Sequence, residues 1–417
     1  MISEPNIRPT TAGYIFDWHN GEESYLKINI SRLSDSNRGL IGEIEIWPSF
    51  MEKYPLLSGI RFNLTSERAR TGLAKRLANL KPQIEWQTII EQVCMGVIEL
   101  YRQGEPVLEL TSNDDVGPLE YLISPLIPMG KPTAIFGDPG SGKSALLLIL
   151  AIIAALPWHD NPLRLGAPAS SSPILYLDYE ADADDIRRLL KAFASGMGLG
   201  FVPLHYRRSS LPIADDLESI RNHADATKTK ALFIDSTSLA AGGDLNRMDV
   251  ATSYMKALRQ LNMTSVSVTH TSKDREAKSK TIIGSVLFEA GFRSVFECRG
   301  QEDDDILDIA LFHRKFNLGA KQKPLGYRIN FNCQGNTVEW LDPKNVPEFV
   351  ARMSNTRQIL ELLKGGSKSV REIIDELEIS MPIACTALKR LSDKKLVVKL
   401  DNKQWGLLDK NAPLLSR

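Results

Sequence analysis

The sequence contains few cysteines and has no excess of charge of either sign. Only four of its 417 residues are cysteine, they lie tens of residues apart, and no C-x-x-C pair occurs. This spacing excludes a disulfide framework and a zinc site built from cysteine pairs, so reduced and packed thiols are expected. The 51 basic residues balance the 51 acidic residues. The chain is therefore not a uniformly basic nucleic-acid binder, and local basic segments have to be counted separately.

A long apolar run is also missing. The most apolar stretch, Ala145–Pro157, spans 13 residues, which is shorter than the roughly 20 residues that cross a bilayer. A buried helix is expected there instead. The N-terminus lacks the basic and apolar segments of a secretory signal. We therefore expect a cytoplasmic protein without a membrane partner. Its 43% hydrophobic content is that of a globular protein, and at roughly 150 residues per domain its 417 residues predict two or three domains.

Three segments of the chain differ in their patterns. Residues 1–112 combine alternating strand patterns with helical patterns at Ser66–Leu80 and Trp86–Arg102, which predicts an N-terminal α+β accessory domain without a chemical motif. In residues 113–343, short apolar runs alternate with helix-length segments, and more strand patterns follow. This order predicts an α/β core with a parallel sheet and additional antiparallel strands. Residues 344–417 carry three helical patterns and a hairpin pattern, the order of a winged helix-turn-helix.

One motif is complete. The sequence GDPGSGKS matches G-x-x-x-x-G-K-[ST] and lies between a predicted strand and a predicted helix. Glycines let such a loop wrap around a phosphate chain with its N–H groups directed inward, and the N-terminus of the following helix favours the same anion. Lys143 is expected to reach the β- and γ-phosphates, and Ser144 to ligate Mg²⁺. The sequence thus predicts a site for ATP and Mg²⁺, with the nucleotide-binding residues Gly137, Asp138, Pro139, Gly140, Ser141, Gly142, Lys143 and Ser144.

Further polar residues end predicted strands, where the carboxyl edge of a parallel sheet collects ligands. Asp235 ends an apolar run and would hold the hydrated Mg²⁺. Glu180 ends another strand and would deprotonate the attacking water, with Asp178, two residues earlier, as the alternative base. His270 ends a third strand, and its ring N–H would sense the γ-phosphate. A capping or plain surface role is the alternative for each of these residues.

Taken in order, these motifs resemble those of the RecA-like ATPases, and most closely the branch of hexameric plasmid replicative helicases of the RepA type. The resemblance covers about residues 119–341 and rests on the loop, the strands ending in Glu180 and Asp235, and Val268–Lys273. It implies an ATP-hydrolysing, DNA-binding motor, either a helicase or a single-strand DNA translocase. It also implies a homo-oligomer, in this branch a hexameric ring with ATP sites between subunits.

The resemblance further implies which basic residues act across a subunit boundary. In the family an arginine follows a Gly-Ser pair, here Gly284–Ser285 and then Arg293, and a later strand carries basic residues that reach the neighbour's γ-phosphate, here Arg314 and Lys315. Positive charge at that place stabilises the charge that develops on the γ-phosphoryl group. The family often has a basic residue before Gly-Ser, whereas this sequence has Ile283. All three basic residues stay candidates, and an ordinary surface role is the alternative.

Two basic segments predict contacts with nucleic acid. Residues 273–280 carry four basic and two acidic side chains, and a basic loop beyond the sheet edge can follow a phosphate backbone. Residues 355–417 carry 12 basic and 8 acidic side chains, and the helix after Ser380 has basic residues opposite its apolar ones, as a recognition helix does. Docking of a protein is the alternative for this unit. The predicted DNA contacts are Lys273, Arg275, Lys278, Lys280, Lys389 and Arg390.

Two other functions use the same phosphate-binding loop. A regulatory or scaffold ATPase of a mobile element or defence system would bind DNA or a partner without unwinding, and the unmatched N-terminal segment and Ile283 favour it. A small-molecule kinase is disfavoured by the C-terminal helix-turn-helix pattern and by the long apolar helix after the loop. The predicted fold class is α/β, a RecA-like P-loop core with an N-terminal α+β domain and a C-terminal winged helix-turn-helix.

Overall fold

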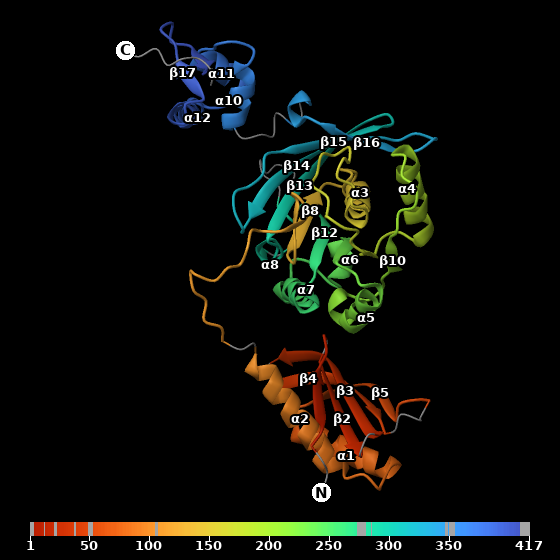
Figure 1. Cartoon of the computed structure of the whole chain (residues 1–417). Coiled ribbons are helices and arrows are strands. Elements are labelled where there is room, and N and C mark those ends of the chain that lie inside the picture. The colour runs from red at the N-terminus through yellow and green to blue at the C-terminus, as the bar shows by residue number, and fades with distance from the viewer. Residues whose placement is uncertain are drawn as a thin grey trace.

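The structure is a computed structural model of the chain, and its elements form three groups that follow one another in sequence (Figure 1). The groups have separate hydrophobic clusters. The structure describes residues 4–11, 13–20, 23–36, 39–48, 53–104, 107–272, 281–284, 286–346, 349 and 355–408.

The first group is an antiparallel five-stranded sheet followed by two helices. Burial alternates along its fourth strand, because one face of the sheet is covered. Phe16 and Trp18 on that face share a hydrophobic cluster with Leu77 and Trp86 of the two helices. The elements are β1 (Asn6–Pro9), β2 (Tyr14–Asn20), β3 (Glu23–Ser36), β4 (Gly39–Trp47), β5 (Leu57–Asn63), α1 (Glu67–Leu80) and α2 (Trp86–Gln103).

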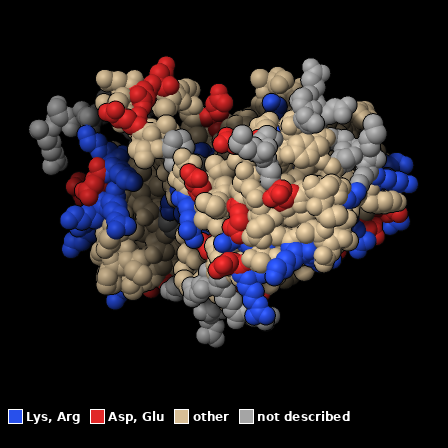
Figure 2. All heavy atoms as spheres, turned by 90° about the horizontal axis from the view of Figure 1, so that it is seen from below, with Lys and Arg blue, Asp and Glu red and all other residues tan. Residues whose placement is uncertain are grey.

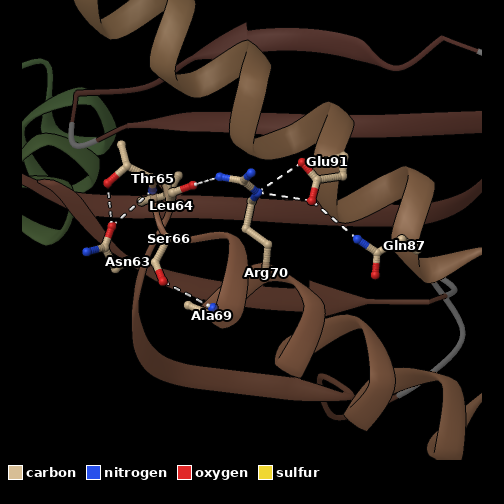
Figure 3. A network of polar contacts seen from close by, with 8 residues as sticks. All are labelled: Asn63, Leu64, Thr65, Ser66, Ala69, Arg70, Gln87 and Glu91. Carbon is tan, nitrogen blue, oxygen red and sulfur yellow. Dashed lines mark hydrogen bonds and ion pairs between the residues drawn. The ribbon is translucent and has the colours of Figure 1, made fainter.

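Arg70 of α1 links this helix to α2 and to the segment after β5 (Figure 3). Its Nε donates to Glu91 at 3.0 Å, and its Nη1 donates to the Leu64 carbonyl at 2.9 Å. Ser66 caps α1 by accepting a hydrogen bond from the Ala69 N–H at 3.3 Å, an arrangement that stabilises a helix by about 1 kcal/mol. These contacts fix the two helices relative to the end of the sheet.

The central group is built on a nine-stranded sheet in the order β10-β9-β11-β12-β8-β13-β14-β15-β16. Neighbours from β10 to β13 pair in parallel, and the remaining neighbours pair antiparallel. The α/β fold with a parallel sheet and added antiparallel strands is therefore confirmed. The strands are β8 (Pro132–Gly137), β9 (Ile174–Asp178), β10 (His205–Arg208), β11 (Ala231–Asp235), β12 (Thr264–His270), β13 (Ser294–Asp303), β14 (Ile306–Phe316), β15 (Leu325–Asn330) and β16 (Thr337–Leu341).

Helices cover both faces of this sheet. Successive residues of a strand point to opposite faces, and accordingly Ile135 belongs to the cluster of α3 and Phe136 to the cluster of α7. Among the described residues, no helix combines the length and apolar composition needed to span a membrane. The helices are α3 (Lys143–Ala155), α4 (Ala183–Gly196), α5 (Leu217–Thr227), α6 (Thr237–Ala240), α7 (Met248–Leu261) and α8 (Val286–Gly291), and short β6 (Tyr121–Ile123) pairs with β7 (Ile127–Pro128).

The third group consists, within residues 355–408, of three helices and a two-stranded hairpin. In its last helix Ala384, Leu388 and Leu391 are buried, while Lys389 and Arg390 are exposed, so the predicted orientation of this helix is confirmed. The elements are α10 (Asn355–Leu363), α11 (Val370–Leu377), α12 (Met381–Asp393), β17 (Val397–Lys399) and β18 (Trp405–Leu407).

The surface does not carry charge of a single sign. On the face that Figure 2 shows, basic and acidic side chains are interspersed and separated by uncharged areas. This agrees with the balanced composition of the chain. Any attraction of a polyanion therefore has to come from local clusters of basic residues.

Candidate nucleotide-binding site

The loop between β8 and α3 packs closely against the antiparallel part of the sheet. Gly140 and Gly142 have φ angles of +78° and +81°, in the left-handed region that favours glycine. A Cβ atom at Gly142 would lie 2.7 Å from the Cδ1 atom of Ile309 in β14. Below the loop, the Cys298 thiol donates to the Ser141 carbonyl at 3.2 Å. Gly142 is therefore required both by its backbone conformation and by close packing.

The loop borders a cavity of about 500 Å³ near the carboxyl ends of β9, β11 and β12. Most of the residues predicted from the sequence meet there, namely Pro139, Gly140, Gly142, Lys143, Ser144, Glu180, Asp235 and His270. Asp138 and Ser141 instead line a second cavity of about 430 Å³, which Pro139 and Gly140 of the loop also border. Residues that the sequence did not single out complete the first cavity, and they are Ala145, Leu189, Ser236, Val268, Glu302, Leu307 and Phe331.

Lys143 lies at the start of α3 and is largely buried. Its Nζ donates to the Asp138 carbonyl at 2.7 Å. Burial lowers the pKa of Lys143, because removal of water disfavours the charged ammonium, and nearby acidic groups oppose this change. A bound phosphate chain would supply negative charge directly beside this ammonium.

Asp235 ends β11 and is 5% exposed. Burial raises its pKa to about 6, although the nearby hydroxyls of Ser144 and Tyr176 act in the opposite direction. Tyr176 donates to Oδ2 at 3.1 Å, whereas among the described residues Oδ1 has no hydrogen-bond partner. A buried carboxylate oxygen beside a hydroxyl is the type of donor set that Mg²⁺ prefers. The residues present therefore fit a magnesium ion held by Asp235 and Ser144.

Asp178 and Glu180 have different surroundings. The Asp178 side chain is buried, and its Oδ1 accepts hydrogen bonds from the backbone N–H groups of Glu180 and Ala181, both at 2.9 Å. Its Oδ2 accepts a hydrogen bond from the Tyr206 hydroxyl at 3.0 Å. The Glu180 side chain is 42% exposed and lines the cavity. The geometry therefore favours Glu180 over Asp178 as the base.

Ser236 and His270 are the polar neighbours of the Glu180 carboxylate. Ser236 is 2% exposed, and its hydroxyl donates to Oε1 of Glu180. The Nε2 atom of His270 lies 4.0 Å from the same oxygen. Burial lowers the pKa of His270, so its imidazole is neutral at pH 7. The sequence offered no motif for Ser236, and its position next to Asp235 becomes informative only once β9 and β11 are known to be adjacent.

The three basic residues predicted to act on a neighbouring subunit lie at the opposite edge of the sheet. Cys298 of β13 pairs with Gly137, at the carboxyl end of β8, whereas Ser294 pairs with Thr133 near its start. Arg293 precedes Ser294 and is thus about 17 Å from Cys298 along the strand. Arg314 and Lys315 lie beside the same end of β13. None of the three lines the described cavity at the phosphate-binding loop.

Two of these basic side chains already have partners. Arg314 donates from Nε to Oε2 of Glu297 at 2.6 Å, and Lys315 donates from Nζ to three backbone carbonyls around the end of α8 at 2.6, 2.9 and 2.9 Å. The Arg293 side chain is exposed. Within the part of the chain that the structure describes, no hydrogen bond or ion pair engages its guanidinium.

Four predicted DNA contacts, Lys273, Arg275, Lys278 and Lys280, lie outside the described residues, as does Ser285. The residues that flank this segment on both sides are described. Thr271 and Ile282 form an antiparallel bridge, and the Thr271 hydroxyl donates to the Asp138 carboxylate at 2.6 Å. Thr271, which precedes the basic segment, is thus connected to the phosphate-binding loop.

Comparison with known proteins agrees with this geometry. Residues 105–276 match the family model described as an AAA domain. The central segment is similar to AAA domains. Together with the parallel sheet and the complete loop, this match supports a RecA-like P-loop ATPase core. The RepA-type helicase branch stays a prediction.

The other comparisons add little. The solved structure of a KaiC-like protein from the hyperthermophilic archaeon Pyrococcus horikoshii aligns with 54% of this chain and 100% of its own chain, at 16% identity and a TM-score of 0.37. No curated protein matches the chain.

Proposed function

We propose that the protein is an ATP-hydrolysing motor that acts on DNA, a helicase or single-strand translocase of the RecA-like type. The observation that carries the proposal is that Lys143, Asp235 and Glu180 line one and the same cavity beside the glycine-rich loop. The loop amides, the N-terminus of α3 and the Lys143 ammonium form a binding site for a triphosphate.

We assign a separate role in ATP hydrolysis to each polar residue of the cavity. Ser144 and Asp235 would hold the magnesium ion that accompanies the nucleotide, and this ion would supply positive charge to the phosphate oxygens. We propose that Glu180 accepts a proton from the attacking water, because its carboxylate lines the cavity and is 42% exposed, whereas that of Asp178 is buried. His270 lines the same cavity close to Glu180, and we propose that its neutral ring contacts the γ-phosphate.

The position of the basic candidates supports ATP sites between subunits. Arg293 and Lys315 lie toward the end of β13 that is remote from their own loop, whereas the Arg314 side chain reaches Glu297 further along this strand. We therefore propose that Arg293 and Lys315 can act only at the γ-phosphate of a neighbouring copy. Arg293 is favoured, since Arg314 and Lys315 would have to leave existing partners. We propose a homo-oligomeric ring, with the hexamer as the expected size.

Two regions are proposed to bind DNA. In the third group of elements, interpreted as a winged helix-turn-helix, α12 exposes Lys389 and Arg390 on the side opposite its buried leucines. This arrangement suits contacts with phosphates and base edges. Residues 273–280 are the second region. The flanking residue Thr271 donates a hydrogen bond to Asp138 of the phosphate-binding loop.

A second candidate function is a regulatory or scaffold ATPase that binds DNA or a partner without unwinding. The N-terminal sheet and helices favour it, because their described residues share one hydrophobic cluster that lies outside the segment matching the AAA domain. A unit of this kind suits the recruitment of a partner.

ATP hydrolysis by the purified full-length protein, with and without single-stranded DNA, tests these functions. The motor predicts hydrolysis that single strands stimulate, together with strand displacement on a forked duplex. The Glu180→Gln variant is expected to bind ATP normally while its turnover falls roughly hundredfold. Hydrolysis that DNA does not stimulate, without strand displacement, would favour the second candidate.

A further inference from the structure

Glu180 is held from two sides by residues that the proposed chemistry does not use directly. Asp178 accepts a hydrogen bond from the Glu180 backbone N–H at 2.9 Å and so fixes the turn that follows β9. From the neighbouring strand, the Ser236 hydroxyl donates to Oε1 of the Glu180 side chain. The backbone is therefore fixed by one contact and the carboxylate by another.

The Ser236 hydroxyl comes from a rigid part of the fold. Asp235, the preceding residue, pairs with Asp178 across β11 and β9. The Asp235 carbonyl also accepts a hydrogen bond from the Tyr179 N–H at 2.6 Å, and the Ser236 carbonyl accepts one from the Ala240 N–H at 3.1 Å, within the first turn of α6. A nearly fully buried donor on such a backbone has little freedom to move.

We propose that Ser236 is a positioning residue that orients the Glu180 carboxylate for proton transfer. This inference rests on the proposed ATP hydrolysis. With Oε1 bound to the Ser236 hydroxyl, Oε2 is the oxygen that faces the attacking water. The water oxygen bonds to the γ-phosphorus while the bond to the β–γ bridging oxygen breaks, and the proton of the water passes to Oε2. Without the Ser236 hydroxyl, the half-exposed Glu180 carboxylate is free to turn toward the His270 ring, whose Nε2 atom lies 4.0 Å from Oε1.

The first experiment compares Ser236→Ala and Ser236→Thr in the full-length protein by steady-state ATP hydrolysis. We expect Ser236→Ala to lower kcat at least about tenfold, because a displaced base loses its alignment, while the KM for ATP and the magnesium dependence stay unchanged. Ser236→Thr keeps a hydroxyl and restores most of kcat. If Ser236→Ala does not fold, Ser236→Cys replaces it, since a thiol is a weaker donor than a hydroxyl.

A double-mutant cycle separates positioning from a general structural effect. In the Glu180→Gln background, Ser236→Ala is expected to cause no further loss of kcat, because the group that it positions is already disabled. An equal loss in both backgrounds would overturn the proposal. Ser267→Ala is the matched control, because the buried Ser267 hydroxyl lies 2.9 Å from the Tyr254 hydroxyl and does not line the cavity. The kcat of this variant is expected to equal that of the wild type.

The outcomes distinguish this inference from the function on which it rests. A wild-type protein that hydrolyses ATP together with a Ser236→Ala variant of unchanged kcat contradicts the positioning role alone. A raised KM with unchanged kcat contradicts it as well, because the hydroxyl would then act in nucleotide binding. A wild-type protein that neither binds nor hydrolyses ATP overturns both.

Discussion

Three of the carboxylates near the candidate nucleotide cavity are distinguished by their hydrogen-bond partners. Asp178 is saturated by backbone N–H groups and by Tyr206, Asp235 keeps one oxygen without a partner among the described residues, and Glu180 is bound by Ser236. The sequence placed all three at strand ends. It did not show which were already satisfied, since hydrogen bonds between β9, β10 and β11 join residues far apart in the chain.

His313 of β14 provides a residue-scale test of stability. The ring is buried, its Nδ1 accepts a hydrogen bond from the Gln322 N–H at 3.0 Å, and burial lowers the pKa of His313 to about 4. The unfolded chain binds a proton near pH 6.5, so between pH 6.5 and pH 4 it binds more protons than the folded chain. The free energy of unfolding therefore falls as the pH falls through this window.

The His313→Asn variant removes this titration. Urea unfolding at pH 6.5 and pH 4 is expected to show that the loss of unfolding free energy on acidification is about 1–3 kcal/mol smaller than in the wild type. The same pH dependence in both proteins would mean that His313 is protonated equally in the folded and unfolded states.

At the scale of elements, strong periodicity made prediction possible. The apolar α3 and the fully buried β9 and β11 were predicted from their apolar runs, because a sheet covered on both faces requires continuous apolar strands. The bounds differ by two residues, since α3 begins at Lys143 and not Ala145, and β9 ends at Asp178, so that Glu180 lies in the turn after the strand and does not end it. The strand β10 was missed, since its sequence HYRR is polar and lies at the sheet edge. In β2, buried Asp17 interrupts the apolar alternation and is paired with Arg8, a contact that no local pattern indicates.

The helix α12 gives the element-scale prediction. A variant with both Lys389→Glu and Arg390→Glu is expected to bind duplex DNA at least tenfold more weakly and to lower the slope of log affinity against log salt by about 2, because two phosphate contacts are lost. Fluorescence anisotropy over a salt series measures both quantities. Lys191→Glu, at an exposed position of α4, is the control. Equal losses in the two proteins would assign the effect to net charge and not to α12.

At the scale of the whole molecule, the sheet separates the phosphate-binding loop from the basic candidates. If Arg293 completes the site of a neighbour, Lys143→Ala and Arg293→Ala are each inactive alone but partly active when mixed. Roughly a quarter of the boundaries in a randomly mixed ring then combine an intact loop with an intact arginine. Hydrolysis by the mixture is the measurement. A mixture as inactive as its components would argue against an arginine supplied by a neighbour.

The sequence indicated the order of the three groups but not what the first one binds. Its core residues, such as Trp18 and Trp86, explain packing and carry no chemistry. A function for this group depends on a partner surface, and surface chemistry has no periodic signal comparable to that of a core. The phosphate-binding loop was predictable because its function requires glycines and Lys143 within a few consecutive residues.

Binding of a nucleotide at Lys143 can be measured by calorimetric titration of the intact wild-type protein and of the Lys143→Ala variant with ATP and Mg²⁺. The wild type is expected to take up one nucleotide per chain, and loss of the Lys143 ammonium is expected to weaken this binding at least tenfold, since a charge-assisted contact to the phosphates disappears. Uptake of neither ATP nor ADP by the wild type would contradict the account.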